Sequence, residues 1–381
     1  GYMRHVLVLA GEKMTHLPTK VTTRILAEVI DRNERRYGAS MPALAAMITQ
    51  KYRHDHALTK RHMQDILAAV AMKNHGNGAL NPYAQFQKPI TKEKYLESKL
   101  VADPLRVYDC APITDGAAAL ILSADPGPVK VIGMGQATDT IAVGRRGSLT
   151  SFNSTKKAAK RAYQMAGIGP GEIDFAEVHD AFTTFEIIGT EDLGFFKPGK
   201  GWRALLEGKT ALHGPKPINP SGGLKARGHP VGASGLAQIV EIYWQLKGDL
   251  PAERRVPQAR IGLAQSIGGL ANNNFVTILE RADNRRAGPE SVAAVYQPTI
   301  TDPGKMALKR EFPGHQGRLI TYTTLYATPE GFPTPLTMGF VKTDRGKVVL
   351  AHHSGHHYPT IGQRVVLTNP NGLLLFKKFT I

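Results

Sequence analysis

The length, composition and charge of the chain exclude several classes of protein. Its 381 residues are 42% hydrophobic and 21% charged, which excludes disordered, fibrous and small disulfide-stapled proteins. The 48 lysines and arginines outnumber the 31 acidic residues and give a net charge of +17, which predicts an anionic partner: nucleic acid, a membrane surface or a phosphate-rich ligand. The one cysteine, Cys110, cannot by itself build a disulfide or a thiolate metal site, and it indicates a reducing, cytoplasmic setting.

The first apolar segment, residues 6–10, predicts a buried strand. It is too short for a signal-peptide core or a membrane span. The longest uncharged stretch, residues 262–279, carries Gln265, Ser266 and three asparagines, so we predict no membrane span. A strand buried on both faces needs a neighbour on each side, and we therefore expect an upstream segment or a partner chain to complete the sheet.

Residues 15–105 predict a mostly helical excursion. Apolar side chains recur at helical spacing between residues 41 and 75 and predict two amphipathic helices, which are separated by a basic joint at residues 51–56. Thr91 is predicted to cap a third, shorter helix.

Residues 106–283 alternate strand and helix patterns, which predicts a layered α/β sheet covered on both faces. The segment 116–123 fits either a helix or a strand. Strands are predicted at 129–134, 174–178, 260–265 and 274–279, and helices at 154–166, 181–193 and 232–246. The inward faces of the first and third helices are predicted to carry Ala158, Ala159, Ala162 and Met165, and Leu236, Ile239, Val240 and Tyr243.

The amino-acid composition and the residue pattern change after residue 283. Residues 284–310 are rich in arginine, proline and glycine and predict a linker. Residues 311–381 alternate short strands with turns, at 318–326, 336–342, 347–352, 364–368 and 373–379. Five closely spaced strands predict a small β-barrel of the OB type.

A glycine-dense segment at residues 219–235, NPSGGLKARGHPVGASG, is the strongest chemical signal. It ends where a helix is predicted to begin, so its backbone amides can approach an anion or a carbonyl oxygen. His229 lies between Gly228 and Pro230 and has the chemistry of a base or an oxyanion donor. A tight turn with an incidental histidine is the alternative interpretation.

Segment 219–235 resembles the GHP signature of the thiolase superfamily. Segments 11–14 (GEKM) and 109–119 (DCAPITDGAAA) match the family in the same order, and segment 177–182 (EVHDAF) resembles its sterol-carrier-type branch. The resemblance covers residues 5–281 and implies a layered αβαβα body. It divides the chain into the end of an N-terminal half (1–124) with a helical loop domain (about 15–105), and a C-terminal half (125–283).

The resemblance also implies an acyl-CoA enzyme similar to acetyl-CoA acetyltransferases, with coenzyme A as part of the substrate and no metal. His229 would then be the base and His179 the oxyanion donor, with Ser266 as a further catalytic residue. The implied substrate-binding residues are Asn219, Gly222, Gly223, Gly228, Ser234 and Phe182.

The departures from the family concern cysteine. The family's nucleophilic cysteine precedes segment 11–14, and the positions of its second cysteine hold Ala181 and Ser266 here. Cys110 matches neither position and is expected to be a buried apolar filler. We favour a thiolase that is N-terminally incomplete, with the thiol on a missing segment or another chain, acting on a 3-oxoacyl-CoA by thiolysis or Claisen condensation. A cysteine-free retro-aldolase acting on a β-hydroxyacyl-CoA is the alternative, and a non-catalytic binding module is a third reading.

The predicted barrel resembles the OB-fold domain that accompanies sterol-carrier-type thiolases. Its aromatic residues also suit single-stranded nucleic acid, which we disfavour because they fit a barrel core and rim (Tyr322, Tyr326, Phe340 and Tyr358). The histidines within 352–357 predict a solvated hairpin loop and not a metal site. Basic residues either face the CoA phosphates or lie scattered on the surface (Arg145, Arg146, Lys156, Lys157 and Arg227). We expect a homo-oligomer or hetero-oligomer.

Overall fold

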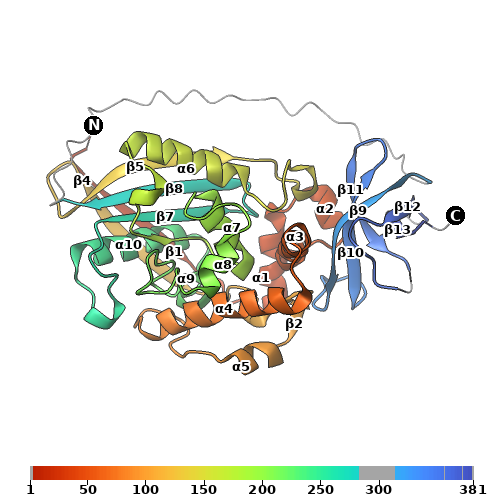
Figure 1. Cartoon of the computed structure of the whole chain (residues 1–381), viewed down its shortest axis with the longest axis horizontal. Helices are drawn as coiled ribbons and strands as arrows, with labels where there is room; N and C mark the ends of the chain where they lie inside the picture. Colours follow the sequence, from red (N-terminus) through yellow and green to blue (C-terminus); the bar gives the residue numbers. More distant parts are fainter. Residues whose placement is uncertain (1–2, 283–313, 356, 371, 380–381) are drawn as a thin grey trace.

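A computed structural model describes residues 3–282, 314–355, 357–370 and 372–379. The layered body lies at one end of the molecule and the barrel at the other. Helix α3 (Met41–Asp55) lies between them, and α4 (Lys60–Ala79) runs along the lower edge of the body (Figure 1). The predicted linker at 284–310 lies outside the described residues.

A four-stranded sheet forms the centre of the body, in the order β5 (Val129–Thr138), β8 (Asn273–Arg281), β7 (Ile261–Gly268), β6 (Phe175–Glu177). The β6–β7 pair is parallel and the other two pairs are antiparallel. Helix α6 (Asn153–Ala166) covers one face and α10 (Ser234–Lys247) the other. The predicted strands and helices of this region are therefore present, with ends that differ by a few residues.

A second, two-stranded sheet follows on the far side of α10. It pairs β1 (His5–Glu12) with β4 (Gly116–Ser123) in antiparallel register, so the ambiguous segment 116–123 is a strand. Since α10 packs on both sheets, the described body has successive α, β, α and β layers, as in the thiolase fold.

The prediction of which α10 residues point inward is right for Ile239, which packs against a buried cluster, and wrong for Leu236, Val240 and Tyr243. The buried stripe carries Gln238, Glu241, Ile242 and Gln245, while the predicted apolar stripe is only half-buried. Glu241 can be buried because it forms an ion pair with Arg254, whose side chain is also buried. Periodicity counts apolar residues and therefore misses a face that is buried through paired polar groups.

Two further burial predictions are wrong. Met165 of α6 is 45% exposed, because the face of that helix that packs on the sheet consists of its alanines together with Ser154 and Thr155. In β1, Leu7 and Leu9 are 67% and 72% exposed, as is Ile121 of β4 at 69%. The reason is that, among the described residues, β1 pairs with β4 alone and nothing covers the outer face of the pair.

The excursion is helical as predicted. Its long helices are α3 (Met41–Asp55) and α4 (Lys60–Ala79), and the side chains of Ser40 and Thr59 cap them. Thr91 caps α5 (Lys92–Glu97) by accepting a hydrogen bond from the Lys94 amide, as predicted. The remaining elements are α1 (Thr19–Leu26), α2 (Arg32–Arg36) and two unpredicted short strands, β2 (Leu100–Ala102) and β3 (Leu105–Arg106).

The C-terminal region is a closed five-stranded barrel. Its strands are β9 (Gln316–Leu325), β10 (Leu336–Thr343), β11 (Val348–His353), β12 (Arg364–Thr368) and β13 (Leu375–Lys378), and β9 closes the ring by pairing with both β10 and β12. Ala102 of β2 pairs with Leu325, which joins the excursion to the barrel sheet. The Thr321 hydroxyl donates to the Met47 carbonyl of α3 at 2.7 Å. No helix in the described part of the chain is long and apolar enough to cross a bilayer.

Candidate active site

His179 follows β6, where the strand gives way to a loop. The Ile267 amide of β7 donates to His179 Nδ1 at 3.2 Å, so the neutral ring carries its proton on Nε2. The side chain is only 4% exposed. Burial, and then the nearby His229 and Arg227, hold the pKa of His179 well below its usual value. The ring is therefore neutral and presents an N–H donor at Nε2.

His229 has the opposite hydrogen-bonding arrangement. Its Nδ1 lies 2.7 Å from Ser234 Oγ, and the Ser234 hydroxyl donates its proton to the Pro230 carbonyl at 2.8 Å. Ser234 Oγ must therefore accept from Nδ1–H, which leaves a free lone pair on Nε2. Burial, followed by the charge of Arg227, lowers the pKa of His229 to about 4. This ring is a neutral acceptor, as a base must be before it takes a proton.

The two rings contact each other edge to face. Their centroids are 5.1 Å apart and their planes meet at 86°. The structure therefore brings together the two histidines to which the resemblance gives catalytic roles. One neutral donor and one neutral acceptor thus lie side by side, an arrangement that can accept a proton from one atom while stabilising negative charge on a neighbouring oxygen.

Helix α9 (Gly223–Arg227) carries the loop toward His229, and Asp180 fixes its start. The Asp180 carboxylate accepts from the Leu224 amide at 2.6 Å and from the Lys225 amide at 3.3 Å. Gly223 has a φ of +60° and lies so close to this carboxylate that a side chain would collide with it. The residue after His179 therefore positions the segment that carries His229.

Helix α4 supports the same loop from below. The Asn74 side-chain amide donates to Asp180 at 2.7 Å and to Glu186 of α7 (Thr183–Asp192) at 2.8 Å. Asn219 donates to Glu186 at 2.9 Å and accepts from the Val178 amide at 2.8 Å. Asn74, Asp180 and Asn219 are fully buried. This hydrogen-bond network therefore anchors segment 219–235 to helix α4 of the excursion.

The predicted substrate-binding residues fall into two groups. Asn219, Gly222 and Gly223 are buried and contact other parts of the chain; Gly222, for example, lies directly against Gly78. Gly228 has a φ of +115° and lies against Thr114, whose hydroxyl accepts from the His229 amide at 2.9 Å. The three residues of the first group thus support segment 219–235, while Gly228 and Ser234 lie next to His229.

Ser266 and Phe182 lie on either side of this group. Ser266 precedes the Ile267 amide that contacts His179, and its half-buried side chain lies against Gly235 in the first turn of α10. Phe182 is 6% exposed and packs against Phe185 with ring centroids 5.3 Å apart. The structure therefore brings Ser266 near the histidines and places Phe182 in the hydrophobic core.

Cys110 has the surroundings of a structural residue. Its thiol contacts the Arg106 carbonyl oxygen at 3.6 Å, and its backbone pairs with Phe182. Burial raises the pKa of the thiol to about 12, so it stays protonated at neutral pH. These contacts agree with the expectation of an apolar filler.

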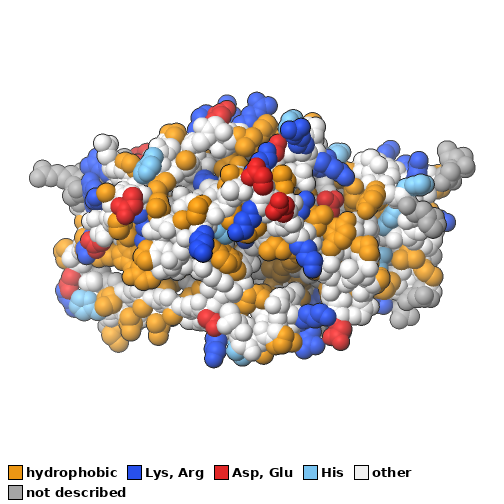
Figure 2. All heavy atoms as spheres, turned by 90° about the horizontal axis from the view of Figure 1, so that it is seen from below, with side chains coloured by type: hydrophobic (Ala, Val, Ile, Leu, Met, Phe, Trp, Pro, Cys, Tyr) orange, Lys and Arg blue, Asp and Glu red, His pale blue; other side chains and the backbone are white. Residues whose placement is uncertain are grey.

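Two of the basic residues proposed to face CoA phosphates are engaged within the protein. Arg146 donates to the carbonyls of Thr140 and Leu270, and Arg227 approaches Glu177 at 3.6 Å. On the face shown in Figure 2, basic side chains are dispersed among acidic and hydrophobic ones. Within the described residues, no group of three or more His, Cys, Asp or Glu side chains is arranged to hold a metal ion.

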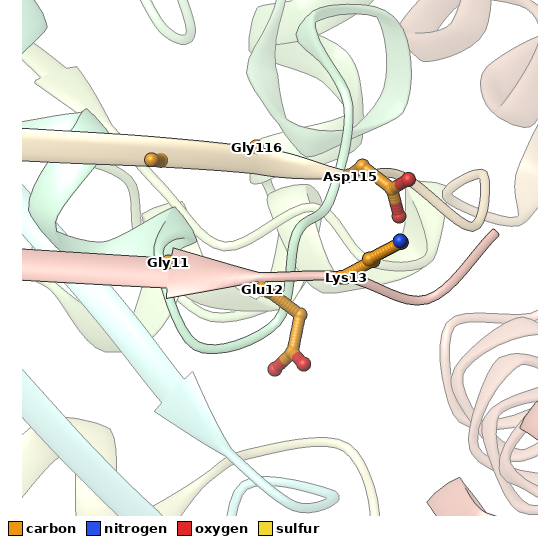
Figure 3. A pocket seen from close by; sticks show the side chains of 6 residues that line it. Gly11, Glu12, Lys13, Asp115 and Gly116 are labelled. Carbon is orange, nitrogen blue, oxygen red and sulfur yellow. The ribbon is translucent and has the colours of Figure 1, made fainter. Parts of the chain in front are cut away.

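An open hollow adjoins the His229 loop at the end of β1 and the start of β4. Gly11, Glu12, Lys13, Asp115, Gly116 and Ala117 line it. In Figure 3, Lys13 points toward Asp115 across the two strands, while Glu12 points away from them. Gly116 lies against Pro230, and Glu12 accepts from the Gly232 amide at 3.1 Å. The hollow therefore opens beside the loop that begins at His229.

Comparison with known proteins identifies the family. Residues 1–125 match the model of the thiolase N-terminal domain and residues 135–281 that of the thiolase C-terminal domain. An acetyl-CoA acetyltransferase of Methanothermobacter thermautotrophicus is 42% identical over 289 residues, which are 74% of each chain. The chain belongs to the thiolase superfamily. Because its relatives in that superfamily include an acetyltransferase at this identity, it is an enzyme.

More distant relatives share the thiolase fold. Bovine sterol carrier protein 2 is 34% identical over 279 residues, which are 69% of this chain and 51% of that protein. A monomeric SCP2-thiolase-like protein from Mycobacterium smegmatis covers 99% of this chain at 17% identity, with a TM-score of 0.73 over 77% of its own length. The Ltp2–ChsH2(DUF35) aldolase matches 64% of both chains at 24% identity, with a TM-score of 0.57. These two structures show the fold alone.

Proposed function

We propose that this thiolase-superfamily enzyme transfers acyl groups by thiolytic cleavage or Claisen condensation of a 3-oxoacyl-CoA. The observation that carries the proposal is the contact between His179 and His229, whose Nε2 atoms are a donor and an acceptor. The acetyltransferase named among the relatives supports acyl-CoA as the substrate class.

In thiolysis, His229 Nε2 takes the proton of the attacking thiol, and the thiolate adds to the 3-oxo carbon. The bond between C2 and C3 then breaks, and its electron pair moves to C2, forming the enolate of the departing acetyl-CoA, while the shortened acyl group stays on the nucleophile as a thioester. His179 Nε2–H donates to the thioester oxygen, where the enolate charge accumulates. The proton on His229 returns to C2, and CoA finally takes the acyl group from the nucleophile.

We further propose that the attacking thiol comes from outside these 381 residues. Cys110 is the only cysteine, and its buried, protonated thiol is unsuited to attack. The hollow beside Pro230 and Gly232 offers an approach to the His229 loop for a partner or a further segment (Figure 3).

The retro-aldolase is the second candidate, and the state of Cys110 is the observation that favours it. There His229 would take the proton of a β-hydroxyl group, the bond between C2 and C3 would break, and His179 would stabilise the resulting enolate. This reaction needs no thiol.

Intact mass after incubation with acetyl-CoA or acetoacetyl-CoA distinguishes the two. A covalent acyl adduct on the protein, or on a chain purified with it, supports acyl transfer. Turnover of a 3-hydroxyacyl-CoA with no adduct supports the aldolase, and no turnover of either substrate contradicts both.

The finer organisation is part of the same proposal. We assign residues 1–124, with a loop domain at about 15–105, and 125–283 to the two thiolase halves, and 311–381 to an OB-like domain that helps to admit acyl-CoA. The uncovered β1 strand supports an oligomer, with another copy or a different chain. We also assign the enzyme to the cytoplasm, because a lone cysteine suits a reducing compartment.

A further inference from the structure

Arg227 ends α9 two residues before His229, and its guanidinium lies inside the loop. The side chain is 10% exposed. Nη1 lies 3.6 Å from a Glu177 carboxylate oxygen and 3.4 Å from Ser221 Oγ. Nη2 donates to the Ser234 carbonyl at 3.4 Å, and the hydroxyl of that same serine holds His229 Nδ1. The guanidinium and the His229 ring are therefore both held by Ser234.

Glu177 has the corresponding position relative to His179. It lies two residues earlier, in β6, and its side chain is fully buried. Its carboxylate accepts from the Ser221 amide at 2.9 Å and from the Ser221 hydroxyl at 2.7 Å. The Glu177–Arg227 pair thus connects the strand that leads to His179 with the helix that leads to His229.

We propose that Arg227 is a positioning residue: its guanidinium holds the segment that leads to His179 and the segment that carries His229 at a fixed spacing, and it places a buried positive charge near both rings. The geometry supports this role because the guanidinium contacts Glu177, on the strand that leads to His179, and Ser234, which holds His229. The effect of Arg227 on turnover rests on the proposed function, in which His229 acts as a base, because only the neutral form of its ring can accept a proton.

The remaining charged groups around the pair do not substitute for Arg227. Glu241 of α10 acts on Glu177 but is itself paired with Arg254. Glu12 is engaged with the Gly232 amide on the other side of the loop. Burial is the main cause that lowers the pKa of each histidine. The Arg227 charge is the next cause for His229, whereas for His179 the nearby His229 comes next and Arg227 after it. Removing this cation should therefore raise both pKa values.

The test is a pH titration of the imidazole nitrogens by NMR in the full chain, with His179→Gln and His229→Gln variants to assign the signals. Arg227→Met removes the charge and Arg227→Lys keeps it. Arg254→Met removes the other buried Arg–Glu pair and is the matched control. Since Arg227→Met leaves the buried Glu177 without its cationic partner, the double variant Glu177→Gln/Arg227→Met provides a folded alternative.

We expect the His229 titration midpoint to rise by about one pH unit or more in Arg227→Met and in the double variant. Arg227→Lys and Arg254→Met should leave it within a few tenths of a unit. In a turnover assay with acetoacetyl-CoA and CoA, the acid limb of the pH profile should move upward by the same amount. Unchanged midpoints in both charge-removing variants would overturn the proposal, as would an equal rise in Arg227→Lys. The NMR result does not depend on turnover, so it stands or fails separately from the proposed function.

Discussion

The rings of His179 and His229 meet edge to face with centroids 5.1 Å apart, and the chain holds Nδ1 of each ring in a different way. A backbone amide donates to Nδ1 of His179, whereas Nδ1 of His229 donates to the Ser234 hydroxyl. Two chemically identical side chains therefore present opposite groups at Nε2. This division of roles is what allows one ring to take a proton while the other stabilises an oxyanion.

Replacing Ser234 with alanine should weaken the base without unfolding the protein. The variant loses the acceptor that holds His229 Nδ1–H, so both ring tautomers become populated. Loss of one hydrogen bond, about 1 kcal/mol, predicts a fall in kcat of about fivefold. Imidazole NMR should show mixed tautomers at His229, and the exposed Ser148→Ala control should show neither effect. A single unchanged tautomer would contradict the assignment.

Replacing Cys110 with alanine should leave turnover nearly unchanged. The thiol is protonated and contacts the Arg106 carbonyl oxygen. The folded protein should accordingly react slowly with a thiol reagent and rapidly after unfolding in urea. Loss of turnover in Cys110→Ala, with an unchanged unfolding midpoint, would show that Cys110 is the nucleophile after all.

His75 of α4 should make the fold sensitive to acid. The side chain is 2% exposed, its ring stacks on Phe86, and burial lowers its pKa to about 4. The unfolded chain binds a proton at this residue near pH 6.5 and the folded chain does not, so the contribution of His75 to stability is lost as the pH falls from 6.5 toward 4.

Urea unfolding at pH 7 and pH 5 measures that effect. The His75→Phe variant should lose less free energy of unfolding between the two pH values than the parent chain. The exposed His62→Phe variant on the same helix is the control and should behave like the parent. An equal pH dependence in His75→Phe and the parent would refute the assignment.

The uncovered β1–β4 face should mediate association. Leu7, Leu9 and Ile121 are each more than 65% exposed, which is unusual for neighbouring apolar residues on one sheet face. Light scattering should give a mass of at least twice that of the chain, and Leu9→Glu should reduce it. Leu206→Glu, at another exposed leucine, should not. A stable monomer at micromolar concentration would contradict this expectation.

The spacing of apolar residues predicted most helices and strands of this fold correctly, but it did not predict which of their side chains are buried. Helices α3 and α4 and the strands of the barrel were predictable because each has a local pattern of apolar residues. The buried stripe of α10 was not, because Glu241 is buried only by virtue of Arg254, thirteen positions later. Strands β2 and β3 are too short to have a pattern; they pair with each other, and β2 also pairs with the distant β9.

The site was predictable to the extent that its residues belong to motifs. His179, His229 and Ser234 lie in the two motif segments, and the resemblance pointed to them. The supporting residues Asn74 and Glu186 were missed, because their importance comes from contacts across more than a hundred positions. The spacing of Asn74 and Asn77 on α4, with Asn81 just after its end, was an available signal, since three buried amides so close in sequence need partners.

Turnover of acetoacetyl-CoA with CoA by the His229→Ala variant tests the central claim most directly. The assay should use the protein as isolated, with any chains that copurify, and circular dichroism should establish that the variant is folded. Loss of a general base predicts a fall in kcat of about a hundredfold or more at unchanged unfolding midpoint. A folded His229→Ala variant with kcat within a few-fold of the parent would contradict the assignment of the His179–His229 pair as the active site.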